Sequence, residues 1–123
     1  MGLAAGEAVM AGDIQETVAH GTGVEAGDAV AISGGEAVAA NTEANDLAGV
    51  ASESGDTVVI HGVAVAAVAS GVAQGAALTA GNATGTSDGQ LIAGDGRGLA
   101  LSGEGGTWHG MAVPDGYAVV LIS

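Results

Sequence analysis

Glycine interrupts almost every apolar run of this 123-residue chain, and this punctuation limits what the chain can fold into. Residues 56–78 read DTVVIHGVAVAAVASGVAQGAAL, in which valine and alanine alternate between glycines. Each glycine inside a helix costs about 1 kcal/mol relative to alanine, whereas turns and bulges use glycine readily. The pattern therefore predicts an all-β fold of short strands, with a short helix within residues 66–77 as the alternative.

Three segments make this prediction specific. Residues 28–32 alternate with period two, and the Gly34-Gly35 pair that follows is typical of a two-residue hairpin. Two Val-rich runs flank His61-Gly62, where a tight turn or a bulge is expected. The final run, residues 117–122, is apolar at every position, which indicates a central strand buried on both faces.

The sequence also repeats itself. The pattern G-V-x-x-G-x-A-[VL] occurs at residues 23–30 and again at residues 71–78. A short Gly-Val-Ala or Gly-Leu-Ala segment follows each copy at nearly the same distance, and a Val-Val strand comes after it. We therefore expect two related β units with long Gly-rich loops, in which Val58-Val59 and Val119-Val120 occupy equivalent core positions.

The second unit is longer than the first by an insertion at about residues 102–116, which holds the only Trp and the only Pro of the chain. Two roles for Trp108 remain open. It can fold back as a lid on one end of the core, or it can lie in a contact loop, because Trp is enriched at interface hot spots.

Charge excludes some partners. The chain has seven Asp and seven Glu, but its only Lys or Arg is Arg97, which gives a formal net charge of -13. Nucleic acid binding requires clustered Lys and Arg, so we expect no nucleic acid partner. Salt near 1 M shortens the screening length to about 3 Å and mutes repulsion between carboxylates. The acidity therefore predicts a halophilic source, with an acidic protein from ordinary salt as the alternative.

No catalytic or cofactor motif is recognisable. His20, His61 and His109 lack the spacing of a zinc site, and no serine lies in a G-x-S-x-G turn. The Asn82-Ala83-Thr84 triplet fits a glycosylation sequon, but such triplets often arise by chance. The apolar runs are much shorter than the roughly 20 residues of a membrane span. We therefore expect no enzyme activity, cofactor, metal site or membrane partner.

One family resemblance is present. A Val-x-x-Gly-Asp-strand segment, then NDLAGVASESGDTVVIHGVAVAAVASGVAQGAAL, then the terminal YAVVLIS, resembles the small capsid decoration (cement) proteins of tailed viruses, including those of lambda-like phages. The resemblance covers residues 24–80 and 116–123. It implies a small β-barrel or β-tulip domain, usually trimeric, on the outer capsid surface at three-fold or quasi-three-fold positions. The implied partners are the major capsid protein and further copies of the chain, and the acidity points to a virus of a halophile, such as an archaeal virus.

Two regions are candidates for the contact with the capsid or with neighbouring copies. Residues 1–13 form an Ala/Gly-rich N-terminal arm that either adds a strand to the shell or is a disordered terminus. The remaining residues, 14–123, form the single β domain. The contact candidates in the arm and the insertion are Met1, Leu3, Val9, Met10, Trp108 and His109.

A different class of function also fits the sequence. A Gly-rich β module of a cell surface, used for adhesion or for carbohydrate binding, would use Trp108 as a stacking platform for a sugar.

Overall fold

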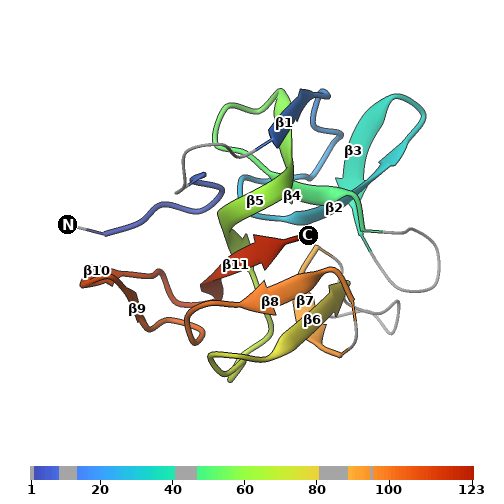
Figure 1. Ribbon diagram of the computed structural model, residues 1–123. Helices are drawn as coiled ribbons and strands as arrows, with labels where there is room; N and C mark the ends of the chain where they lie inside the picture. Colours follow the sequence, from blue (N-terminus) through green and yellow to red (C-terminus); the bar gives the residue numbers. More distant parts are fainter. Residues whose placement is uncertain (1, 9–13, 41–46, 81–88, 95) are drawn as a thin grey trace.

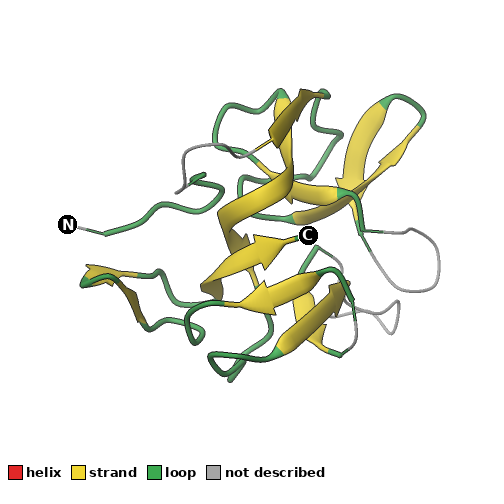
Figure 2. Ribbon diagram, in the orientation of Figure 1, coloured by secondary structure: helices red, strands yellow, loops and turns green. Residues whose placement is uncertain are grey.

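The computed structural model describes residues 2–8, 14–40, 47–80, 89–94 and 96–123. These residues contain strands and turns but no helix (Figure 2), which confirms the all-β prediction. The alternative of a helix within residues 66–77 is wrong. No helix long enough to cross a membrane occurs among the described residues. The strands are β1 (Ile14–Thr17), β2 (Ala29–Ser33), β3 (Glu36–Ala39), β4 (Gly49–Ala51), β5 (Thr57–Ala67), β6 (Ala77–Ala80), β7 (Leu91–Ala93), β8 (Gly98–Ala100), β9 (Thr107–Trp108), β10 (Met111–Ala112) and β11 (Tyr117–Ile122).

Nine of these strands form one antiparallel sheet that curls into a half-barrel (Figure 1). The order across the sheet is β3-β2-β4-β5-β11-β8-β6-β7, and β1 pairs separately with β5. Strands β9 and β10 form their own small hairpin. The last strand, β11, lies between β5 and β8, and most of its side chains are buried, which confirms the prediction of a central strand.

Strand β5 is the longest strand and joins the two halves of the sheet. Its first part pairs with β4 and β1, and its second part pairs with β11. Gly62, with φ 120°, lies where one set of partners replaces the other. The register of β1 on β5 shifts between Ile14 and Gln15, so the irregularity is a β-bulge and the alternative of a tight turn at His61-Gly62 is wrong.

The β2–β3 hairpin has the turn that its sequence predicts. Ser33 lies opposite Glu36, and the two glycines between them have φ of 61° and 82°. Positive φ at both central positions is the type I′ arrangement that matches the twist of the flanking strands. This prediction is confirmed.

Small side chains fill three hydrophobic clusters. The central core joins the first half of the sheet to the second and contains Ala29, Ala31, Ala40, Val50, Val59, Ala64, Ala66, Val68, Val72, Leu78, Ala80, Leu91, Ala100, Ala118, Val120 and Ile122. The first-half core contains Val30, Ala37, Ala51 and Val58, with Val18, Val24 and Ile60 packed against it. The arm–hairpin core contains Leu3, Val63, Val65, Val113 and Val119, with Leu101, Trp108, Met111, Tyr117 and Leu121 packed against it.

Arg97 links the two halves of the sheet by hydrogen bonds from its guanidinium. Its guanidinium donates to the carbonyl oxygens of Leu47 (2.8 Å), Ala48 (3.2 Å) and Ile60 (2.9 Å) in the first half. Its Nε–H donates to the carbonyl oxygen of Ser123 at 2.8 Å. The only cationic side chain other than histidine in the chain therefore binds backbone carbonyls.

Candidate functional site

The described part of the N-terminal arm, residues 2–8, lies along β5 and reaches the β9–β10 hairpin (Figure 1). The Leu3 N–H donates to the carbonyl oxygen of Ala112 at 2.8 Å. Further along, the Gly6 N–H donates to the Val65 carbonyl (2.8 Å), and the Val65 N–H donates to the Glu7 carbonyl (3.0 Å). The arm thus extends the sheet by main-chain pairing, which places few demands on its side chains.

Leu3 anchors this arm. Its side chain is only 7 % exposed and belongs to the arm–hairpin core, together with Val65 and Val113. In this structure Leu3 is therefore a packing residue of the domain and not an exposed contact. Of the other arm candidates, Met1, Val9 and Met10 lie outside the described residues.

The hairpin places Trp108 and His109 differently. Trp108 lies opposite Met111, and the two residues between them, His109 and Gly110, have φ of 48° and 79°. Trp108 is half-buried against the arm–hairpin core, as a lid would be, whereas His109 is exposed at the tip. Their rings meet edge to face with centroids 4.5 Å apart.

The structure therefore brings the two predicted contact regions together, because the arm and the insertion share one hydrophobic core and one pair of main-chain contacts. Glycine at position 2 lies in a parallel bridge with Ala112. We call the arm, residues 2–8, together with the hairpin, residues 107–112, the arm–hairpin surface.

Glu104 holds the insertion in place, a role that the sequence did not reveal. Its carboxylate accepts hydrogen bonds from the Gly116 N–H (2.7 Å) and the Gly71 N–H (3.2 Å). These two bonds, the Gly116 bond first, lower the pKa of Glu104 below its ordinary value. Buried Ser102 also connects the insertion to β11, because its hydroxyl oxygen accepts a hydrogen bond from the Val119 N–H at 2.9 Å.

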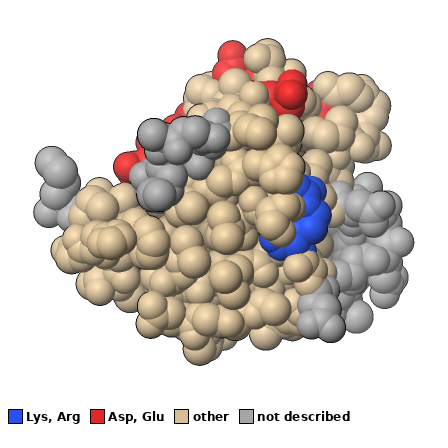
Figure 3. All heavy atoms as spheres, viewed as in Figure 1, with Lys and Arg blue, Asp and Glu red and all other residues tan. Residues whose placement is uncertain are grey.

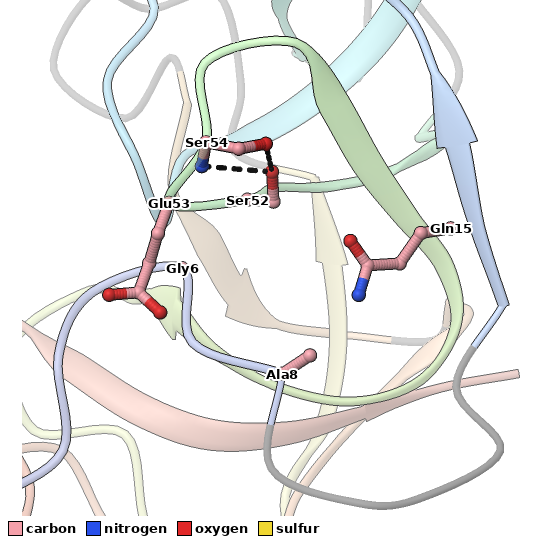
Figure 4. Close-up of a pocket in the computed structure, with 6 residues that line it drawn as sticks. All are labelled: Gly6, Ala8, Gln15, Ser52, Glu53 and Ser54. Atoms are coloured by element: carbon pink, nitrogen blue, oxygen red, sulfur yellow. Dashed lines mark hydrogen bonds between the residues drawn. The ribbon is translucent and has the colours of Figure 1, made fainter.

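A cavity of about 300 Å³ lies between the arm, β1 and the turn after β4 (Figure 4). Its polar lining includes a cluster of hydroxyl groups. The Ser54 hydroxyl hydrogen-bonds to Ser52 Oγ and Thr57 Oγ1, both at 2.9 Å, and donates to Asp56 Oδ1 at 2.9 Å. These groups satisfy one another, so the cluster stiffens the turn. The residues that line the cavity are Gly6, Ala8, Gln15, Ser52, Glu53 and Ser54.

A second polar group surrounds Asp28. Burial raises the pKa of this carboxyl, while a hydrogen bond from the Glu25 N–H to Asp28 Oδ2 (3.0 Å) lowers it in part. Burial also raises the pKa of Tyr117, and the charges of Asp28 and Glu25 add to that effect.

The histidines do not meet in a metal site. The His20 Nε2–H donates to the Thr57 carbonyl at 2.8 Å, and His109 stands at the hairpin tip. No group of three or more His, Cys, Asp or Glu side chains that could hold a metal ion occurs among the described residues. The Asn82 sequon lies outside them.

Charge is unevenly distributed on the face shown in Figure 3. Acidic side chains lie in its upper part, and Arg97 lies to the right of its centre. In the lower part, over β6, β8 and the β9–β10 hairpin, the described residues show no charged side chain on this face.

Comparison of the chain with known protein families, with curated proteins and with solved structures found no match.

Proposed function

We propose that this chain is a structural virion protein that decorates and stabilises the outside of an icosahedral capsid, as trimers at three-fold and quasi-three-fold positions. The observation that carries the proposal is the arm–hairpin surface: an arm paired with β5 by main-chain hydrogen bonds lies beside a hairpin whose tip, His109, is exposed. A surface of this kind suits docking on another protein and requires no chemistry. The resemblance to cement proteins of tailed viruses adds to this proposal.

We also propose that the half-barrel consists of two related β units and is the barrel-like or tulip-like body of such a protein. Strand registers support it. In the first half Ala29 lies opposite Val50, and Val30 lies opposite Gly49. In the second half the corresponding pairs are Ala77 with Leu99 and Leu78 with Gly98.

The remaining strand pairs of the first half also have counterparts with the same register in the second half. The register of β2 on β3 recurs in β6 on β7, and the register of β1 on the first part of β5 recurs in the second part of β5 on β11. The turns agree as well, because the Gly27 N–H donates to Ala51 and the Gly75 N–H donates to Ala100, both at 2.8 Å.

One residue correspondence expected from the sequence needs correction. Val58 lies opposite Ala51, whereas the corresponding residue Ala100 lies opposite Val120. Val58 therefore corresponds to Val120 and not to Val119. The two Val-Val pairs are therefore displaced by one position relative to each other.

Capsids assembled without this protein provide the test. We expect the purified chain to sediment with such capsids in high salt, and we expect His109→Asp to weaken that binding. Ser33→Asp, at the exposed tip of the β2–β3 hairpin, is the matched control and should bind as the parent does. Failure of the parent chain to bind capsids, or equal binding by both variants, would refute this contact surface.

A further inference from the structure

Three large hydrophobic side chains are exposed among the described residues. For two of them, the residue at the corresponding position of the other half is buried. The three residues are Ile14, Ile32 and Leu99, with exposed fractions of 49 %, 46 % and 38 %. Ile32 lies on β2 in the first half, and Leu99 lies on β8 in the second half. Their exposure is best understood from the way the two halves pack on each other in the central core.

Within the chain, one face of the first half covers one face of the second half. The covering face is formed by alternate residues of β2, β4 and β5, all nearly inaccessible in the central core: Ala29, Ala31, Val50 and Val59. The covered face lies inside the curve of the second half and includes Ala66, Leu78, Ala80, Val120 and Ile122. The contact is head-to-tail, since the two halves contribute different faces.

A head-to-tail contact between related units leaves one copy of each face without a partner inside the chain. The strand registers make Ala77, Thr79, Leu99 and Leu121 the counterparts of the covering face. Ala77 and Leu99 are exposed, and Thr79 and Leu121 are half-buried. The second half therefore presents a copy of that face that is open around Ala77 and Leu99, whereas Leu121 packs against the arm–hairpin core.

The first half presents the uncovered copy of the other face. The counterparts of Ala66, Ala80 and Ile122 are Val18, Ile32 and Ile60, by the same registers. Ala80 and Ile122 are 3 % and 1 % exposed, whereas Ile60 is half-buried and Ile32 is largely exposed. Val30 and Val58, the counterparts of the other two residues, are buried in the first-half core, so the open part of this face lies around Ile32.

We propose that a second copy of this chain supplies the missing contact: the face around Leu99 of one copy covers the face around Ile32 of the next. This contact repeats between chains the packing that already joins the two halves within one chain. On the face shown in Figure 3, the described residues over β6 and β8 show no charged side chain.

Because the two faces differ, the contact is heterologous, and the proposed trimer requires that three such contacts close into a ring. The proposal rests on the two-unit organisation and the trimer given under the proposed function, and it adds the surfaces that join the copies. Three copies joined in this way present six related units around one axis.

The test uses Ile32→Glu and Leu99→Glu in sedimentation velocity at high salt, without capsids. Each variant should weaken self-association at least about 30-fold, because a charge then enters the centre of the contact. Thr107→Glu is the control, because Thr107 is exposed on the separate β9–β10 hairpin and belongs to neither face, and it should associate as the parent does. Circular dichroism checks that each variant is folded.

Mixing the two disrupted variants gives the decisive result. The Leu99→Glu chain keeps an intact face around Ile32, and the Ile32→Glu chain keeps an intact face around Leu99. Equimolar mixing should therefore restore a heterodimer, without rings, at close to the parental affinity. A parent chain that stays monomeric, unaltered association of either variant, or no complementation in the mixture would overturn the proposal. Capsid binding is measured separately, so a failure of this contact is distinguishable from a failure of the decoration role.

Discussion

Loss of the Arg97 guanidinium should cost the protein a large part of its stability. In Arg97→Met the aliphatic stem is retained, but the carbonyl oxygens of Leu47, Ala48 and Ile60 lose their donor. These three acceptors are partly buried, while the fourth, on Ser123, is exposed and can bind water instead. At about 1 kcal/mol net for each partly buried bond, the loss is about 3 kcal/mol.

A loss of this size is easy to measure. A domain of this length is expected to have a free energy of unfolding of roughly 5–15 kcal/mol, so the substitution removes a substantial fraction. With an m-value of about 2 kcal/mol per M, the urea midpoint should fall by about 1.5 M, and the melting temperature by about 12 °C. Far-UV circular dichroism in urea, at fixed high salt, gives the midpoint directly.

Arg97→Lys separates hydrogen-bond geometry from charge. A lysine ammonium carries the same charge but cannot span carbonyls in the planar fork of a guanidinium. We expect Arg97→Lys to recover less than half of the lost stability. A free energy of unfolding for Arg97→Met within about 0.5 kcal/mol of the parent, the range of ordinary surface substitutions, would refute the role of Arg97 as the link between the halves.

Three further predictions concern close packing, pH and salt. Gly49→Ala should destabilise the protein by about 3 kcal/mol in the same urea titration, because a Cβ there would collide with the Val59 carbonyl and come within 2.9 Å of Val58 Cγ1. The control Gly55→Ala has open space around the new Cβ and only the strain of φ 83°, so it should cost about 1–2 kcal/mol. The lowered pKa of Glu104 means that its contribution to stability is present above its ordinary value of 4.5 and is lost as the pH falls through the lower folded value; the stability difference between the parent and Glu104→Gln should therefore shrink below that pH, and a difference independent of pH would contradict this. Fourteen carboxylates against one arginine predict that the melting temperature rises between about 0.1 and 2 M NaCl, as the screening length shrinks from about 10 to near 2 Å, and an unchanged melting temperature would remove the halophile interpretation.

Features that depend on local backbone chemistry could be predicted from the sequence. The Gly34-Gly35 pair specifies its own turn, because few other residues adopt positive φ twice in succession. The apolar run of β11 predicts burial on both faces. In each case, neighbouring residues carry the information.

Features that depend on distant contacts could not be predicted. The run through His61-Gly62 continues as one strand because β11 pairs with its second part, and nothing local distinguishes that outcome from a turn. Leu3 is buried in a core to which Val65 of β5 and Val113 of the insertion contribute, the latter more than 100 residues later in the chain. Glu104 resembles any exposed glutamate in the sequence, although it binds two glycine N–H groups at a distance along the chain.

Electron cryo-microscopy of capsids incubated with the protein tests the decoration role most directly. Maps of undecorated capsids and of capsids mixed with the chain in high salt are compared at the three-fold and quasi-three-fold positions. The decoration account predicts additional density on the outer surface there, with three copies around each axis and the β9–β10 hairpin directed toward the shell. Maps that remain identical at saturating protein concentration, or density only inside the shell, would contradict it.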